Sequence, residues 1–113
     1  MKSKKIKPSI IGLGYVGFPI FIQISKKFST VGYDLNKNRI NLLNKGLDNN
    51  EFPTKKFKKT KKMFFTDDWN TLKKSNFFII CVPTPVDKNN KPDLSFLYKV
   101  SNILGKCIKK GDI

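Results

Sequence analysis

Three glycines, at positions 12, 14 and 17, lie between two apolar stretches in the segment SIIGLGYVGFPIFIQI at residues 9–24. A G-x-G-x-x-G pattern between a short apolar run and a longer one is typical of a strand-to-helix turn that holds a phosphate group. In such a turn Gly12 permits the tight bend, Gly14 lets the backbone approach a pyrophosphate, and Gly17 lets the helix pack against the strand. The helix N-terminus then presents unpaired N–H groups to the phosphates.

The same apolar stretch follows the basic start MKSKKIK, which raises the alternative of a secretory signal. A signal peptide would end in a small-residue A-x-A cleavage site, whereas the residues that follow here are SKKFST. The longest purely apolar run, FFIICV at residues 77–82, is far shorter than the roughly 20 residues that a membrane helix needs. We therefore expect a cytoplasmic protein with no membrane partner.

The rest of the chain alternates strand and helix patterns. Strands are expected at residues 5–11, 29–35, 63–66 and 76–82, and helices at 18–28, 36–46, 67–75 and 93–110. Residues 47–62 are interpreted as an exposed lysine-rich loop with at most one helical turn, and 83–93 as a turn-rich loop. The fourth strand is apolar on both faces and is expected to be buried, and DI at 112–113 would begin a fifth. The alternation predicts an α/β fold with a doubly wound, Rossmann-type parallel sheet, incomplete within these residues.

Prolines, glycines and apolar spacing add detail to these elements. Pro8 cannot donate to a strand ladder and should therefore begin the first strand, whereas Pro19 fits the first turn of the first helix. Gly46 should end the second helix, and acids should open the third. The last helix carries one apolar stripe, formed by Leu94, Leu97, Val100, Leu104 and Cys107.

Asp34 closes the second predicted strand, 20 residues after Gly14. A carboxylate at this place can accept hydrogen bonds from ribose hydroxyls and would repel a 2′-phosphate, so NAD is favoured over NADP as the cofactor. Arg39 leaves part of that choice open, because a nearby arginine can accept a 2′-phosphate. The alternative is that Asp34 only caps the following helix.

A formal charge of +15 raises the hypothesis of a nucleic-acid partner. However, 22 of the 23 cations are lysines, and Arg39 alone offers the planar fork that suits base recognition. The chain has no alanine, and lysine, asparagine, isoleucine and phenylalanine dominate its composition. This bias is typical of AT-rich coding sequence, so we expect the lysines to be solvated and no nucleic acid to bind.

The side chains offer few candidates for catalysis or metal binding. The sequence has no histidine, and its two cysteines, Cys81 and Cys107, lack metal-ligand spacing, so no metal site is expected. Cys81 lies within an apolar strand pattern and Cys107 within the apolar stripe of the last helix. Both are interpreted as core residues, and no catalytic residue is assigned.

The segments IIGLGYVGFPI, VGYDLNKNRINLLNKG and FFIICVPTPVDKNNKPDLSFL resemble, in order and spacing, the start of nucleotide-sugar dehydrogenases of the UDP-glucose/UDP-N-acetylmannosamine dehydrogenase family. The VPTPVD…PDLS block is most similar to the UDP-N-acetylhexosamine branch. The resemblance implies that the turn from Gly12 to Gly17 holds the pyrophosphate of NAD, with the N–H groups of Tyr15 and Val16 as donors. It places Asp34 at the adenosine ribose, Arg39 at the adenosine end, and the cofactor cleft beside Val82, Pro83 and Thr84.

Members of this family oxidise the C6 alcohol of a UDP-sugar to a carboxylate for polysaccharide synthesis, with two hydride transfers to NAD and a cysteine thioester. The resemblance implies that residues 1–113 are the N-terminal part of the NAD-binding domain. The central dimerisation domain, the C-terminal UDP-binding domain and the catalytic residues are then absent from these residues. On this interpretation the 113 residues are inactive alone, a UDP-sugar binds only with the rest of the enzyme present, and the full-length enzyme is a homodimer or larger. A stand-alone, non-catalytic dinucleotide-binding module is the alternative, and a basic nucleic-acid-binding protein the remote one.

Overall fold

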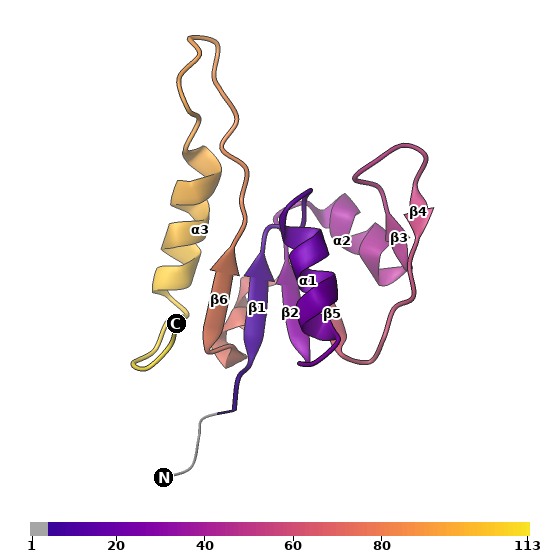
Figure 1. Ribbon diagram of the computed structural model, residues 1–113. Helices are drawn as coiled ribbons and strands as arrows, with labels where there is room; N and C mark the ends of the chain where they lie inside the picture. Colours follow the sequence, from indigo (N-terminus) through magenta and orange to yellow (C-terminus); the bar gives the residue numbers. More distant parts are fainter. Residues whose placement is uncertain (1–4) are drawn as a thin grey trace.

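The computed structural model describes residues 5–113, which form a four-stranded parallel sheet with helices on both faces (Figure 1). The strands lie in the order β5–β2–β1–β6, and each neighbouring pair is parallel. Their bounds are Pro8–Ile11 (β1), Thr30–Tyr33 (β2), Met63–Thr66 (β5) and Phe77–Ile80 (β6). The predicted α/β class is confirmed. Of the basic start MKSKKIK, residues 1–4 lie outside the described residues.

Strand β1 lies inside the sheet between β2 and β6, and all four of its residues are buried. Pro8 begins the strand, as predicted, three residues later than the expected start at 5. Successive side chains of a strand point to opposite faces, so Ile10 joins one hydrophobic cluster and Ile11 another. A strand with apolar residues on both faces can be covered by helices from both sides.

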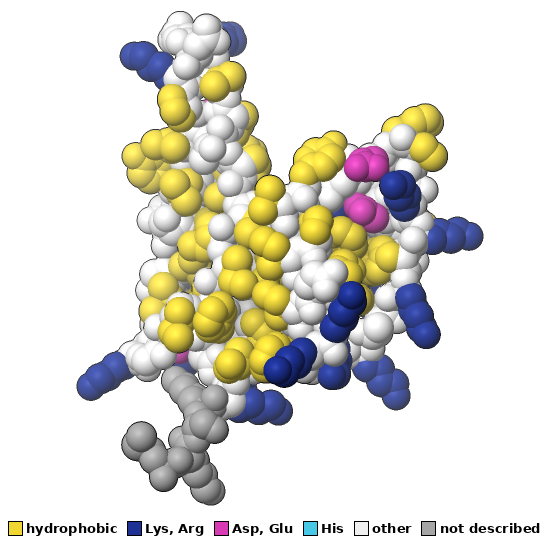
Figure 2. Space-filling model, in the orientation of Figure 1, with side chains coloured by type: hydrophobic (Ala, Val, Ile, Leu, Met, Phe, Trp, Pro, Cys, Tyr) yellow, Lys and Arg dark blue, Asp and Glu magenta, His cyan; other side chains and the backbone are white. Residues whose placement is uncertain are grey.

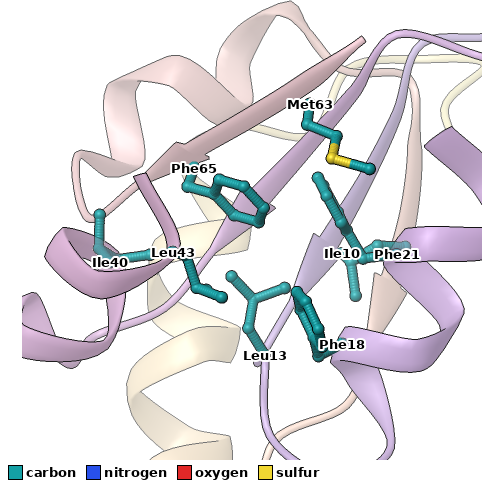
Figure 3. Close-up of a cluster of buried hydrophobic side chains, with 8 residues drawn as sticks. All are labelled: Ile10, Leu13, Phe18, Phe21, Ile40, Leu43, Met63 and Phe65. Carbon is teal, nitrogen blue, oxygen red and sulfur yellow. The ribbon is translucent and has the colours of Figure 1, made fainter. Parts of the chain in front are cut away.

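One face of the sheet is covered by helices α1 (Gly17–Ser25) and α2 (Lys37–Asn44). Phe18 and Phe21 of α1 lie one helical turn apart and point into the same core. Figure 3 shows this cluster, in which Ile10, Leu13, Phe18, Phe21, Ile40, Leu43, Met63 and Phe65 converge. The phenyl ring of Phe21 packs against that of Phe65 at a centroid distance of 4.7 Å.

The opposite face is covered by the 3₁₀ helix η1 (Trp69–Lys74) and by helix α3 (Ser95–Gly105). Their apolar side chains form the second cluster, with Ile11, Tyr33, Leu72, Val100, Leu104 and Cys107. Two separate cores on the two faces make the sheet doubly wound, as predicted. Among residues 5–113, no helix combines the length and apolar character needed to cross a membrane.

The segment 47–62 differs from the predicted loop. It contains a two-stranded antiparallel hairpin of β3 (Leu47–Asp48) and β4 (Lys55–Lys56). Gly46, at φ 75°, ends the α2 region as predicted, and its carbonyl accepts a hydrogen bond from Phe57 N–H at 3.0 Å. Phe57 packs edge-on against Phe18 and Phe65. Phe57 thus anchors a segment in which lysines dominate and Phe52 is 99% exposed, so the composition of the segment did not indicate the hairpin.

The helices are shorter than predicted, for reasons visible at their ends. Helix α1 stops at Ser25 because the next N–H groups, of Lys26 and Lys27, bond three residues back and tighten the last turn. The predicted helix 67–75 is a 3₁₀ helix whose first acid lies outside it, and Asp68 acts as its N-cap by accepting from Asn70 N–H at 3.0 Å.

The predicted burial of the fourth strand was wrong. In the described residues β6 is the outer strand of the sheet, and Ile80 is 45% exposed. Helix α3 buries Val100 and Leu104, but Leu94 and Leu97 stay more than a third exposed. The loop before α3 rises above the sheet, and the first turn of the helix lies near that edge (Figure 1).

Ile113 lies beside β6. Its N–H donates to Asn76 O at 2.9 Å, and its carbonyl accepts from Phe78 N–H at 2.7 Å. This pair of bonds has the pattern of parallel strands, in line with the expectation that residues 112–113 begin a fifth strand.

Candidate functional site

The three glycines of the turn between β1 and α1 differ in whether the surrounding atoms leave room for a side chain. Gly12 has φ 97°, and a Cβ there would lie 2.5 Å from the carbonyl oxygen of Cys81. A Cβ on Gly17 would overlap the carbonyl oxygen of Gly12. Packing of the strand, turn and helix therefore requires glycine at both positions.

Gly14 is different, because a Cβ at this position would meet no atom within 4 Å. Its φ is also outside the left-handed range, so the fold itself does not require glycine here. The space beside Gly14 is an open cradle at the start of α1. A glycine that packing does not require, at the mouth of a phosphate-type turn, fits a ligand that approaches the backbone closely.

The N–H groups beside this cradle are available to an anion. Tyr15 and Val16 are 72% and 65% exposed, and their N–H groups have no hydrogen-bond acceptor among residues 5–113. Phe18 N–H, two residues after Val16, already donates to Gly14 O at 3.1 Å as the helix begins. Free N–H groups and the positive end of the helix dipole suit a phosphate.

Asp34 lies at the end of β2, next to the turn. Its Oδ2 accepts a hydrogen bond from Leu13 N–H at 2.9 Å, and its Oδ1 accepts from Asn36 N–H at 2.9 Å. The N-cap of α2 is Asn36, whose side chain accepts from Arg39 N–H at 3.1 Å. Helix α2 is thus capped by Asn36 and not by Asp34. Each carboxylate oxygen of Asp34 can still accept a hydrogen bond from a further donor.

Arg39 is buried, with 6% of its surface exposed. Its Nε and Nη2 both donate to the carbonyl oxygen of Leu13, at 3.0 and 2.8 Å. Its Nη1 donates to Asp48 Oδ1 at 2.7 Å and to Asn49 Oδ1 at 2.8 Å. The guanidinium also lies over the ring of Phe18, 5.1 Å from the centroid. Arg39 thus ties the glycine turn to the β3–β4 hairpin.

Two pockets flank the turn on either side of Asp34. The first, of about 360 Å³, is mainly apolar and lies between the ends of β1, β2 and β6 and helix α3. It is lined by Ile11, Gly12, Leu13, Gly14, Tyr33, Asp34, Leu35, Asn36, Val82, Pro83, Phe96 and Val100. The second, of about 280 Å³, is more polar and is lined by Leu13, Gly14, Tyr15, Asp34, Asn36, Arg39, Asn49 and Asn50.

The structure thus brings most of the predicted site residues around one turn. Of the three candidates after β6, Val82 and Pro83 line the first pocket, and Thr84 is exposed outside the lining of both pockets. Gly17 is buried beneath the turn. Sequence reasoning missed Phe96 of α3 and the hairpin residues Asn49 and Asn50. The hairpin pair carried no motif, and Phe96 lies outside the apolar stripe that was predicted for the last helix.

Both cysteines are free thiols. Burial raises the pKa of Cys107 and also that of the half-buried Cys81. A raised thiol pKa reduces the thiolate fraction at neutral pH and hence nucleophilicity. Within residues 5–113, His, Cys, Asp and Glu side chains form no group of three that could bind a metal ion.

A doubly wound parallel sheet, a glycine turn at a helix N-terminus and a carboxylate at the end of the second strand define a Rossmann-type dinucleotide-binding domain. The chain belongs to the UDP-glucose/GDP-mannose dehydrogenase family, whose NAD binding domain matches residues 6–113. The cofactor of this domain is NAD.

Relatives with assigned activities support this placement. UDP-N-acetyl-D-glucosamine 6-dehydrogenase from Pseudomonas aeruginosa is 42% identical over 111 residues, which cover 97% of this chain and 26% of that protein. UDP-N-acetyl-D-mannosamine dehydrogenase from Pyrococcus horikoshii is 34% identical over 109 residues, covering 91% of this chain and 26% of that protein. The similarity to the UDP-N-acetylhexosamine branch is confirmed.

Solved structures of nucleotide-sugar dehydrogenases share the fold of this chain. The UDP-D-ManNAc dehydrogenase of Pyrococcus horikoshii superposes with a TM-score of 0.80 at 28% identity, over 96% of this chain and 27% of that one. The GDP-mannose dehydrogenase of Pseudomonas aeruginosa, solved as a ternary complex, gives 0.71 at 26% identity, over 88% of this chain and 24% of that one. The chain spans about a quarter of the length of these relatives.

Proposed function

We propose that these residues bind NAD for a UDP-N-acetylhexosamine 6-dehydrogenase, or for the related UDP-glucose enzyme. Bound NAD would accept the hydride that leaves the sugar C6 carbon. The relative from Pseudomonas aeruginosa at 42% identity supports the N-acetylhexosamine branch. The single observation that carries the proposal is the open cradle at Gly14, beside the free N–H groups of Tyr15 and Val16.

Each part of the site has a role in this proposal. The N–H groups of Tyr15 and Val16 donate to the pyrophosphate, and Gly14 leaves room for it. Asp34 accepts from the ribose hydroxyls, since Leu13 N–H and Asn36 N–H hold its carboxylate in place without saturating it. Asp34 also repels a 2′-phosphate, which favours NAD over NADP.

The first pocket provides apolar walls for the adenosine end of the cofactor. Val82 and Pro83 form one side, at the carboxyl end of β6, and Phe96 of α3 contributes another. Ligands of doubly wound sheets bind outside the carboxyl ends of the strands, where these residues lie. We also propose that Thr84 offers its hydroxyl toward the cofactor. Arg39 would act at the adenosine end by supporting the turn.

The proposal for the whole protein is oxidation of the C6 alcohol of a UDP-sugar to a carboxylate, for polysaccharide synthesis. Residues 1–113 would be the N-terminal part of the NAD-binding domain, with the catalytic residues and the UDP-sugar site on other parts of the enzyme. We further propose a homodimer or larger assembly in the cytoplasm, where two free cysteines would stay reduced.

Nucleic acid is not a proposed partner. Figure 2 shows lysine and arginine side chains spaced around the periphery of the visible face, with hydrophobic side chains over its middle. A groove that tracks a nucleic-acid backbone would gather these charges in one stripe.

The proposal is tested by combining the Asp34→Ala variant with a change in the ligand. Calorimetry would measure the Kd of NAD and of two smaller ligands, ADP and 2′-deoxy-ADP. If Asp34 accepts from the ribose 2′-hydroxyl, the wild-type protein binds ADP about 10- to 150-fold tighter than 2′-deoxy-ADP, because one hydrogen bond to a charged group is lost. In Asp34→Ala that preference should disappear.

The outcomes separate clearly. Unchanged NAD affinity in Asp34→Ala would refute the placement of the ribose, and so would a 2′-hydroxyl preference that survives the substitution. No binding of NAD to the wild-type protein would refute the proposed function as a whole. Formation of NADH from NAD and a UDP-N-acetylhexosamine tests the activity of the whole protein.

A further inference from the structure

The β3–β4 hairpin reaches the cofactor turn through Arg39, the only arginine of the chain. We propose that Asp48 acts with Asp34 in the selectivity for NAD over NADP, because it engages Arg39 and so makes this arginine unavailable to a 2′-phosphate. The inference rests on the proposed function and adds to it a residue that belongs to neither the glycine turn nor the parallel sheet.

The donor count of Arg39 supports this role. A guanidinium has five N–H groups, and the contacts to Leu13, Asp48 and Asn49 use four of them, one on Nε, one on Nη2 and two on Nη1. Strong recognition of a phosphate by arginine is bidentate and needs two parallel N–H groups. A single N–H remains, on a side chain that is 7% exposed. Arg39 is therefore positioned to support the turn rather than to receive a second phosphate.

The charges lead to the same conclusion. Arg39 Nη1 and Asp48 Oδ1 form an ion pair of 2.7 Å whose side chains are 7% and 22% exposed. Their charges offset each other, which leaves the carboxylate of Asp34 as the uncompensated charge among the residues lining the second pocket. A 2′-phosphate carries roughly two negative charges and would meet that carboxylate without a cation to balance it.

Asp48 also shapes the wall of the second pocket. Its Oδ1 accepts a hydrogen bond from Asn50 N–H at 3.1 Å, and both Asn49 and Asn50 line this pocket together with Asp34. One carboxylate thus fixes the arginine and the start of the hairpin turn. Because β3 and β4 are only two residues long, this fixation depends on side chains more than on the strand ladder.

The test compares the ratio of the Kd for NADP to the Kd for NAD in variants of the purified full chain. Asp48→Asn removes the charge and keeps an oxygen acceptor, whereas Asp48→Glu restores the charge. Glu51→Gln is the matched control, since Glu51 is in the same hairpin, pairs with exposed Lys55 at 3.2 Å and contacts neither Arg39 nor the pockets. Calorimetric titration gives both constants, and circular dichroism checks that each variant is folded.

The inference predicts that Asp48→Asn lowers the ratio by about three- to tenfold, the effect of one partly screened charge. Asp48→Glu and Glu51→Gln should keep the wild-type ratio. A purely structural role of Asp48 would weaken both cofactors equally and leave the ratio unchanged, which would overturn the inference. An equal fall of the ratio in Glu51→Gln would also overturn the inference, because the fall would then result from the change in net charge and not from the Asp48–Arg39 contact. Failure of the wild-type protein to bind NAD would overturn the proposed function itself and the inference with it.

Discussion

Replacing Gly14 and Gly17 in turn by alanine separates what the fold needs from what the ligand needs. In Gly17→Ala the new Cβ overlaps the carbonyl oxygen of Gly12, which is a backbone atom of the turn. In Gly14→Ala the new Cβ meets no atom within 4 Å, and the backbone is outside the left-handed range. The two variants add the same methyl group three residues apart.

The expected magnitudes follow from these surroundings. Overpacking against a fixed backbone atom lowers the free energy of unfolding of Gly17→Ala by about 1–3 kcal/mol. Gly14→Ala should be neutral, or more stable by up to about 1 kcal/mol, because alanine reduces the entropy of the unfolded chain. The methyl group of Gly14→Ala then fills the cradle that the pyrophosphate needs, so its affinity for NAD should fall at least about tenfold.

The assay is urea unfolding followed by the fluorescence of Trp69, the single tryptophan, together with calorimetric titration of NAD. We expect Gly14→Ala to be stable but to bind NAD at least about tenfold more weakly, and Gly17→Ala to be destabilised. Equal destabilisation of both variants would refute the claim that the fold requires glycine at position 17 but not at position 14. Unchanged NAD affinity in Gly14→Ala would refute the placement of the pyrophosphate.

Two further predictions concern single side chains. Burial, and then the nearby carboxylates of Asp67 and Asp34, raise the pKa of Tyr33 above its ordinary value of 10.0. Above pH 10 the folded state therefore keeps a proton that the unfolded state loses. The contribution of Tyr33 to the free energy of unfolding is complete below pH 10 and is lost above it. In urea unfolding between about pH 9 and 11, the free energy of unfolding should therefore fall less steeply with pH in Tyr33→Phe than in the wild-type protein. The same pH dependence in both proteins would contradict this prediction. Asn36→Ala removes the N-cap of α2 and should lower the free energy of unfolding by about 1 kcal/mol. Asn38→Ala, on the exposed side of the same helix, should change it by less than about 0.5 kcal/mol. Equal effects of the two substitutions would contradict the role of Asn36 as N-cap.

The sheet and the turn could be predicted because local residues determine them. The glycine spacing, the apolar run before it and the carboxylate at position 34 each have a short-range physical cause, and the structure brings them together. Pro8 at the start of β1 and Gly46 after α2 were predicted correctly for the same reason. Their constraints act on the backbone of the residue itself.

Features that depend on distant partners could not be predicted. The hydrophobicity of β6 does not reveal whether another strand covers its far side, so its exposure at Ile80 was missed. The β3–β4 hairpin has strands of two residues, too short for any periodicity to show. The burial of Arg39 likewise depends on Asp48 and Asn49, nine and ten residues along the chain, and no local pattern marked them as its partners.

The central claim is that the backbone of the glycine turn binds the pyrophosphate of NAD while Asp34 binds the ribose. A crystal structure of the protein with NAD tests it most directly. The account predicts pyrophosphate oxygens about 2.7–3.2 Å from the amide nitrogens of Tyr15 and Val16, and a ribose hydroxyl at the same range from the Asp34 carboxylate. NAD bound with its pyrophosphate away from these amides, or with its ribose away from Asp34, would contradict the claim.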